Sequence, residues 1–385
     1  MLKTLKIKLK GRGSKMSESK RIFIEDLERG DNFNHDELKS LYQNVVEGLD
    51  KLDYYKDREL LFKVKDIFKE HKMMFETARI TREIAASYYK EGRIGKAIKY
   101  AEESVDILQN NTHDCDVSEA LVSYITSIAV CYSEIFSYQS SLHNFKKCKE
   151  IINDNISDDV LSRYYHEYGI VCIYFRTYDK AKKLLNKALE YTDDSIKRGF
   201  IYNDIGRYYW KIKRPLDSRR AYDKAIELFK SVNDNDGLSL IYNNLAMLYY
   251  STKKVEQAAE WIEKCFEIFD KSNPKYCIMY FDTYIRIILR KHDFGGAVDK
   301  LLEFIGVSDD YSFNKRYILE PIDLVVDRVS KFKNEEYGIK LKNILLHLIR
   351  QSQEDSVKND YYTDKLYEYL GRLKYLFYPK TKRRN

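Results

Sequence analysis

The stretches IYNDIGRYYW (201–210) and IYNNLAMLYY (241–250) lie forty residues apart and share most of their pattern. Both begin with Ile, Tyr and Asn, have a small residue at the sixth position and carry a Tyr pair near the end. Each is followed by a second amphipathic stretch, SRRAYDKAIELF in the first case and VEQAAEWIEKCFEIF in the second. This duplication predicts a repeated pair of helices.

The same spacing recurs at three earlier places in the chain. In every copy, a small residue of the first helix is followed twelve positions later by a small residue of the second helix. The five pairs are Ala85 with Ala97, Ala129 with Ser141, Gly169 with Ala181, Gly206 with Ser218, and Ala246 with Ala258. Two helices approach closely only where the crossing residues are small, so the spacing predicts five helical hairpins. A sixth copy keeps Ala297 but has Ile285 at the first position.

Composition agrees with a helical fold. The chain has 385 residues but only 15 Gly and 4 Pro, and helix interiors tolerate neither residue well. A single hairpin cannot bury its own apolar face, so the hairpins are expected to stack on their neighbours. We therefore expect an all-α protein.

The small, Tyr, Ala and Ala positions at these offsets resemble the tetratricopeptide repeat (TPR) superfamily from about Ala78 to Ile305. This resemblance implies a right-handed TPR solenoid of helical hairpins with a concave groove. The small residue of the second helix recurs at intervals of 44, 40, 37, 40 and 39 residues, longer than the roughly 34 of a standard repeat. Longer hairpins of this kind are similar to those of bacterial peptide-pheromone receptors, including the Rap-type response-regulator inhibitors and the arbitrium receptors. That narrower resemblance implies a groove that grips a short peptide.

We expect four parts along the chain. Residues 1–16 are a basic leader that we expect to be disordered, and residues 17–75 are an N-terminal helical bundle. Residues 76–305 hold the repeats, and residues 306–385 hold atypical C-terminal capping helices and a basic tail. The purine-rich codons expected for KGRG, just before Met16, leave Met16 as an alternative start to Met1.

Asn203 and Asn243 lie three residues before the small residue of their helices, in the row that the TPR arrangement turns toward the groove. Asparagine is unfavourable in mid-helix because its amide competes for backbone hydrogen bonds. The same amide carries a donor and an acceptor that match a peptide unit. Helices about 8–10 Å apart would hold backbone groups about three residues apart in an extended chain. The alternative is that these amides only bond to a neighbouring helix, or were copied by duplication without a function.

Other side chains are expected in the same groove. Arg82, His166 and Asp282 occupy the asparagine row in other copies. Arg207 and Arg286, one helical turn further along, suit carboxylates. Trp210, Tyr250 and Tyr174 are expected to contact apolar side chains of a ligand.

Several function classes have no support in the sequence. The seven histidines form no HExxH motif, and the six cysteines form no CxxC pair. We therefore predict no enzyme activity, no metal and no cofactor. The first stretch lacks the uninterrupted apolar core of a signal peptide, and no segment approaches the roughly 20 apolar residues of a membrane span, so we expect a cytoplasmic protein. With 67 basic and 60 acidic residues, the net charge of +7 is no nucleic-acid signature, and no helix-turn-helix is apparent.

The function that follows is a non-enzymatic one. We predict that the groove binds a short peptide or an extended protein segment, as in a quorum-sensing regulator. Its output would pass through a second protein partner at the terminal helices, near Tyr367 for example. A DNA partner is not supported by a motif, but the basic residues Lys20 and Arg21 and the earlier lysines leave it open. The alternative is a constitutive scaffold for protein–protein interaction.

Overall fold

The computed structural model describes residues 35–48, 58–111, 117–310, 318–354 and 360–377. The predicted basic leader, residues 1–16, and the basic C-terminal tail lie outside these residues. Every described element is a helix, as predicted. The chain divides into two compact units, Met1–Tyr191 (unit 1) and Thr192–Asn385 (unit 2).

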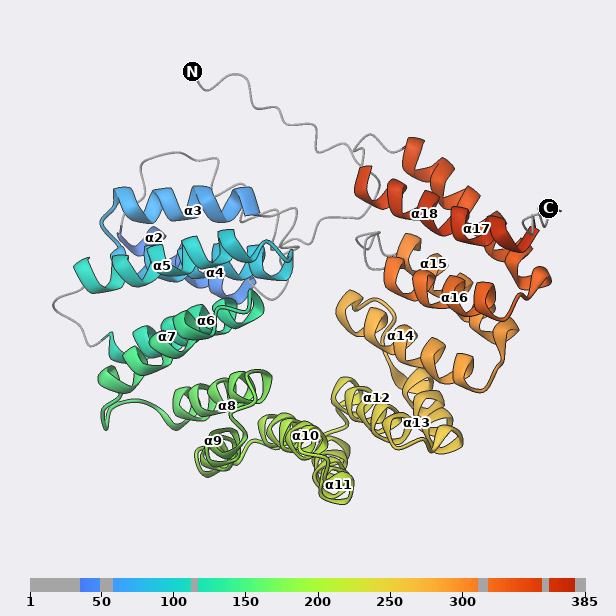
Figure 1. The fold of residues 1–385 in the computed structure, drawn as a ribbon. Helices are drawn as coiled ribbons and strands as arrows, with labels where there is room; N and C mark the ends of the chain where they lie inside the picture. The colour runs from blue at the N-terminus through green and yellow to red at the C-terminus, as the bar shows by residue number, and fades with distance from the viewer. Residues whose placement is uncertain (1–34, 49–57, 112–116, 311–317, 355–359, 378–385) are drawn as a thin grey trace. The chain divides into compact units, whose positions relative to one another are not determined.

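Unit 1 contains helices that pack as hairpins in chain order (Figure 1). They are α2 (His35–Gly48), α3 (Arg58–Glu70), α4 (Met74–Lys90), α5 (Ile94–Asn111), α6 (Ser118–Glu134), α7 (Tyr138–Ile151), α8 (Asp158–Tyr174) and α9 (Tyr178–Glu190). The pairs α4/α5, α6/α7 and α8/α9 are the first three predicted hairpins. Helices α2 and α3 contribute Leu38, Leu61 and Phe68 to a core that they share with α4, α5 and α6.

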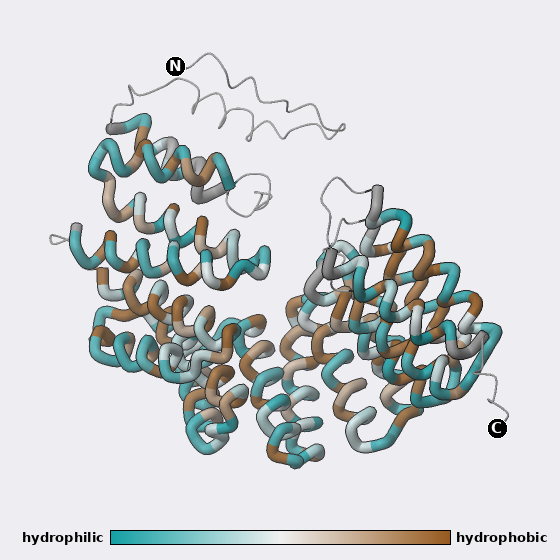
Figure 2. Tube along the Cα trace, turned by 45° about the horizontal axis from the view of Figure 1, so that its top comes forward, coloured by the Kyte–Doolittle hydropathy of each residue, from teal (hydrophilic) through white to brown (hydrophobic). Residues whose placement is uncertain are grey.

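Unit 2 continues the same arrangement. Its helices are α10 (Ser195–Lys211), α11 (Pro215–Ser231), α12 (Asn235–Ser251), α13 (Val255–Ile268), α14 (Pro274–Arg290), α15 (Phe294–Asp310), α16 (Leu319–Lys331), α17 (Glu335–Glu354) and α18 (Asp360–Phe377). Hydrophobic and hydrophilic positions alternate along these helices (Figure 2), and one core runs from Ala246 of α12 to Leu373 of α18.

The helices of each hairpin cross at the predicted small residues. All six second-helix residues of the series, from Ala97 to Ala297, are completely buried. Where that residue is serine, it also bonds across the hairpin: the Ser218 hydroxyl donates to the carbonyl of Gly206 at 2.8 Å. A Cβ atom added to Gly206 would lie 2.4 Å from the Tyr222 ring. The spacing therefore marks the places where two backbones meet most closely, as predicted.

The repeats are longer than a standard TPR, and the extra residues are not spread evenly over the helices, turns and loops of each repeat. Each first helix from α4 to α14 has 17 residues, and each is joined to its partner by a three-residue turn. The second helices and the loops after them vary in length. The changing interval between repeats is thus absorbed on the second-helix side, and the first helices keep a constant length.

In most hairpins the turn contains a residue with left-handed backbone conformation that is not glycine. The middle turn residue has a φ of 60° at Lys213, 63° at Lys253 and 61° at His292. The next backbone N–H then bonds to a carbonyl five residues earlier, as from Lys254 to Tyr249 at 2.9 Å. This is the Schellman pattern that satisfies the last carbonyls of a helix.

Helices α16 and α17 form a further hairpin that the spacing did not predict. They are joined by the same turn, with a φ of 51° at Lys333, and they pack on α14 and α15. Gly338 of α17 lies 41 residues after Ala297 and continues the small-residue series, but its partner twelve positions earlier is Val326. The bulky valine hid this copy.

Candidate functional site on the first helices of unit 2

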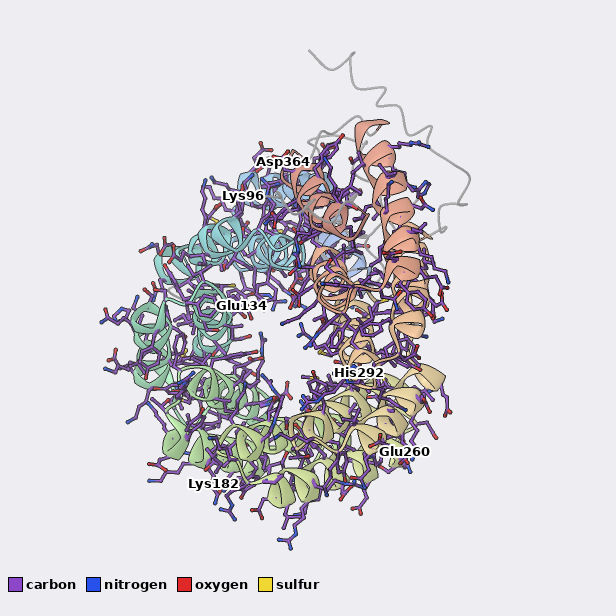
Figure 3. All side chains as sticks on the ribbon, turned by 45° about the vertical axis from the view of Figure 1, so that its right-hand side comes forward. Lys96, Glu134, Lys182, Glu260, His292 and Asp364 are labelled. Atoms are coloured by element: carbon purple, nitrogen blue, oxygen red, sulfur yellow. The ribbon has the colours of Figure 1, made fainter. Side chains whose placement is uncertain are left out.

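The first helices of unit 2 lie side by side in the order α10, α12, α14 and α16, which we call the first-helix layer. Seven of the ten predicted site residues are on it: Asn203, Arg207, Trp210, Asn243, Tyr250, Asp282 and Arg286. The other three, Arg82, His166 and Tyr174, are on first helices of unit 1. In Figure 3, Glu260 marks the second helix α13 of unit 2 and His292 marks the turn after α14.

Two hydrogen bonds connect α10 to α12. Asn203 is only 4% exposed, and its Oδ1 accepts a hydrogen bond from Nδ2 of Asn244 at 2.6 Å. Trp210 donates its indole N–H to the hydroxyl of Ser251 at 3.0 Å. These contacts fix the accessible amide of Asn244 and the Trp210 ring relative to each other.

An ion pair within α10 holds Arg207. Its Nη1 lies 2.6 Å from Oδ1 of Asp204, one helical turn earlier. The Asp204 side chain is 6% exposed, whereas that of Arg207 is 25% exposed. A buried carboxylate thus anchors a guanidinium group that reaches the surface, an arrangement that pre-organises Arg207 for an anionic group.

Asn243 of α12 differs from Asn203 in its hydrogen bonding. It is 1% exposed, and its Oδ1 is buried without a hydrogen-bond partner. A buried polar atom without a partner typically costs about 1–3 kcal/mol. Asn243 therefore contributes less to stability than Asn203, although the two occupy equivalent positions.

An ion-pair network connects α14 to α16. Arg286 Nε lies 2.6 Å from Oδ2 of Asp282, and its Nη2 lies 2.8 Å from Oε1 of Glu320. The hydrogen bond to Asp282 raises the pKa of Arg286 above its ordinary value. The other Asp282 oxygen, Oδ1, is buried without a hydrogen-bond partner.

Tyr250 connects α12 to α14 through an aromatic contact. The guanidinium carbon of Arg290 lies 5.0 Å from the centroid of the Tyr250 ring. With the two contacts between α10 and α12 and the bridge from Arg286 to Glu320, polar contacts join each first helix of unit 2 to the next. We call this set of contacts the polar ladder.

The two predicted asparagines differ from expectation in one respect. Both were expected to present their amides to a ligand, but both are almost fully buried, and the Asn203 oxygen is occupied by Asn244. Asn203 is bonded to the next first helix, α12, and Asn243 is buried without a partner for its oxygen. The accessible groups are one position or one turn further along: Asn244, Arg207 and Arg286. The double Asn at 243–244 was the available signal for Asn244.

In unit 1, the three predicted residues have mixed environments. Arg82 pairs with Glu83, and its guanidinium carbon lies 5.5 Å from the Tyr124 ring centroid. His166 is half-buried on α8, and Tyr174 is 56% exposed at the end of that helix. Figure 3 shows Glu134 at the end of α6 and Lys182 on α9 in the same unit.

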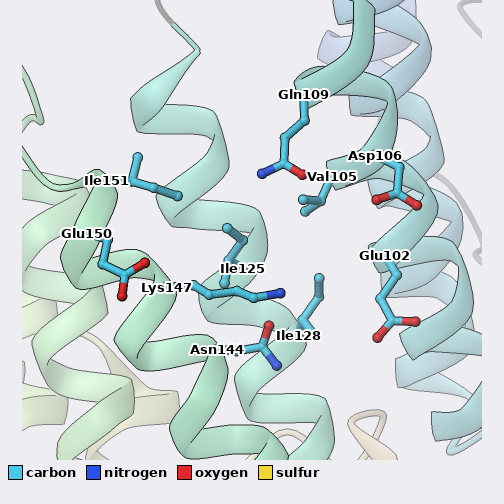
Figure 4. Close-up of a pocket in the computed structure, with 10 residues that line it drawn as sticks. All are labelled: Glu102, Val105, Asp106, Gln109, Ile125, Ile128, Asn144, Lys147, Glu150 and Ile151. Carbon is cyan, nitrogen blue, oxygen red and sulfur yellow. The ribbon is translucent and has the colours of Figure 1, made fainter.

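Unit 1 also contains a hollow of about 490 Å³ among α5, α6 and α7 (Figure 4). Ile125 and Ile128 line its floor, and Glu102, Asp106 and Glu150 lie around its rim. It is not formed by the predicted groove residues. Sequence reasoning missed it because acidic residues on a helix surface are common and carry no spacing signal.

The described residues contain no set of three or more His, Cys, Asp or Glu side chains placed to hold a metal ion. Burial raises the pKa of the Cys131, Cys148 and Cys277 thiols to about 12 each, so these three are protonated near neutral pH. Within the described part of the chain, no helix is both long and apolar enough to span a bilayer.

The tetratricopeptide repeat family matches residues 198–271, which include most of α10 and all of α11 to α13. The predicted TPR resemblance is confirmed for this stretch, which carries half of the polar ladder. The narrower resemblance to peptide-pheromone receptors stays a prediction. No curated protein matches the chain in sequence.

Three solved structures illustrate how distant the structural likenesses are. A tetratricopeptide repeat protein from Parabacteroides merdae is 15% identical, with a TM-score of 0.49 over 74% of this chain and 98% of its own. BtubC from P. vanneervenii is 18% identical, with a TM-score of 0.46 over 57% of this chain and 92% of its own. A signal transduction ATPase with numerous domains and a TPR sensor, from Pyrococcus horikoshii, is 18% identical, with a TM-score of 0.46. The match covers 96% of this chain and 54% of that ATPase.

Proposed function

We propose that the chain binds an extended protein segment along the first-helix layer of unit 2. The observation that carries this proposal is the polar ladder together with the Asp204–Arg207 ion pair within α10, because these contacts fix donors, acceptors and cations on consecutive helices before any ligand arrives. Pre-organised groups bind more tightly because little side-chain entropy is lost on association.

The spacing of the ladder suits an extended chain. Packed helices lie about 8–10 Å apart, and an extended segment advances about 3.3 Å per residue. Consecutive first helices would therefore meet backbone groups about three residues apart. Side chains between those points would contact the Trp210 and Tyr250 rings.

The residues divide into two roles. Arg207, Asn244 and Arg286 contact the segment, because each has accessible surface. Asn203 and Asp204 act behind them as positioning residues, through the bonds to Asn244 and Arg207. Asn243 and Asp282 each keep one buried oxygen without a hydrogen-bond partner, and neither is assigned a contact with the segment.

The first helices of unit 1 form a separate candidate surface for an extended segment, within unit 1 alone. Arg82, His166 and Tyr174 occupy first helices there, and the Arg82 side chain is 28% exposed. We propose that these three residues contact a segment bound on unit 1.

The finer form of the proposal is a peptide-responsive regulator. A short free peptide would occupy the layer, and the terminal helices would then meet a second protein, with Tyr367 of α18 exposed for that contact. A constitutive scaffold would instead hold the tail of a larger protein. Co-purification with and without added peptide separates the two, because only the regulator changes its bound protein when peptide is added.

The test of segment binding uses the immobilised full chain and a pool of random ten-residue peptides, with retained peptides identified by mass spectrometry. Arg207→Gln and Asn244→Ala should each weaken a retained peptide by about 1–3 kcal/mol, because each removes a hydrogen bond to the ligand. The matched control is Arg220→Gln on the second helix α11, whose side chain is 78% exposed. Failure to retain any peptide, or equal losses in all three variants, would contradict the proposal.

A further inference from the structure

A second feature of unit 2 is a hollow at the end of the first-helix layer, where α14 and its turn face α16. Its volume is about 240 Å³. Three arginines line it, Arg286 and Arg290 from α14 and Arg328 from α16. Tyr250, Leu289, His292 and Leu324 complete the lining, and we call this site the arginine hollow.

The positive charge of the arginine hollow is only partly compensated. Asp282 and Glu320 neutralise Arg286. Among the residues that the structure describes, neither Arg290 nor Arg328 has a carboxylate partner. The Arg290 and Arg328 side chains are both exposed, so water and salt screen part of their mutual repulsion, and an anion placed between them lowers the remainder.

Two acceptors of the chain near these arginines already accept hydrogen bonds from the backbone. The carbonyls at the end of α14 accept hydrogen bonds from the turn, as Leu289 does from His292 N at 3.2 Å. The neighbouring carboxylate of Asp293 accepts the backbone N–H of Gly296 at 2.8 Å. The donors of Arg290 and Arg328 thus remain open to a ligand.

The rest of the lining combines aliphatic and aromatic side chains. Leu289 is only 5% exposed and Leu324 is partly buried, so the hydrocarbon floor is formed mainly by Leu324 and the Tyr250 ring. The Tyr250 ring stays near the Arg290 guanidinium, and the His292 ring lies edge-on to Phe332 at a centroid distance of 5.4 Å. A fully hydrated inorganic ion would leave this floor unused, whereas an anion on an apolar stem would cover it.

We propose that the arginine hollow binds an oxyanion, a carboxylate or a phosphoryl group, carried on an apolar stem. The oxyanion accepts hydrogen bonds from Arg290 and Arg328, and the stem packs on Leu324 and the Tyr250 ring. Guanidinium groups favour such oxygen pairs because their donors form a planar fork. The inference deepens the proposed function, because Tyr250 and Arg286 belong to both sites and the anion would sit at one end of the bound segment.

The test uses small probes, so that it does not depend on segment binding. Saturation-transfer NMR with the full chain compares N-acetyl-leucine with N-acetyl-leucinamide, and phenyl phosphate with phenol. At least one oxyanion probe should bind, and its uncharged analogue should bind at least about tenfold more weakly. Which of the two binds identifies the source of the oxyanion.

The variants locate the site. Arg290→Gln and Arg328→Gln should each weaken the bound probe about tenfold or more, and Arg220→Gln on α11 should leave it unchanged. Equal binding of charged and uncharged probes, or no effect of the two variants, would overturn the inference while leaving segment binding intact. If the chain binds a probe but retains no peptide from the random pool, the proposed function is overturned and the inference about the arginine hollow stands.

Discussion

At the residue scale, Asn203 and Asn243 occupy equivalent positions in α10 and α12 but differ in hydrogen bonding. Asn203 is bonded to Asn244 of the next hairpin, whereas Asn243 has a buried oxygen without a partner. The row containing both could be predicted, since it follows from the position of the small residues. Their burial could not, because it depends on the residue that the next first helix places over them.

This difference predicts opposite effects of one substitution. Asn203→Leu removes a buried hydrogen bond and should lower the free energy of unfolding by about 1–3 kcal/mol. Asn243→Leu replaces an unsatisfied buried oxygen with a side chain of similar size, so it should leave the free energy of unfolding unchanged or raise it. Urea unfolding followed by circular dichroism measures both. Equal destabilisation by the two variants would show that the Asn203–Asn244 bond contributes nothing.

At the element scale, each hairpin depends on the close approach of its two helices. The register of five hairpins could be predicted, because small residues twelve positions apart have a direct steric meaning. The α16/α17 hairpin could not, since Val326 replaces the small residue. The left-handed turns were equally hidden, because Lys213, Lys253 and His292 carry no glycine signal.

The close contact between the two helices of a hairpin predicts that a methyl group added at the crossing point lowers stability. In Gly206→Ala the new Cβ would lie 2.4 Å from the Tyr222 ring, so overpacking should lower the free energy of unfolding by about 1–3 kcal/mol. Gly371→Ala is the matched control, because nothing lies within 4 Å of a Cβ there in α18. Alanine should stabilise that helix by up to about 1 kcal/mol. Urea unfolding of both variants checks the prediction, and a neutral Gly206→Ala would contradict the crossing geometry.

At the scale of the whole molecule, the chain forms two compact units, and their boundary falls between α9 and α10. The spacing of small residues gives no sign of this division, because it reports contacts within one hairpin. Composition and the repeat spacing could predict the all-α class. The arginine hollow could not be predicted, because Tyr250, Arg290 and Arg328 meet only when three first helices are stacked.

The chain contains two tryptophans, one on a first helix of a hairpin and one on a second helix. Trp210 belongs to the polar ladder, whereas Trp261 is on the second helix α13, 5.4 Å from the Tyr242 ring centroid. The variants Trp261→Phe and Trp210→Phe therefore leave one reporter each, the first on a first helix of the proposed binding surface and the second on the second helix α13.

The most direct test of segment binding is a fluorescence titration of both variants, as full chains, with a peptide retained from the random pool. The emission of Trp210 in Trp261→Phe should change and saturate with the same dissociation constant that calorimetry gives for that peptide. The emission of Trp261 in Trp210→Phe should stay constant. A peptide that binds by calorimetry but leaves the Trp210 emission unchanged would contradict binding on the first-helix layer.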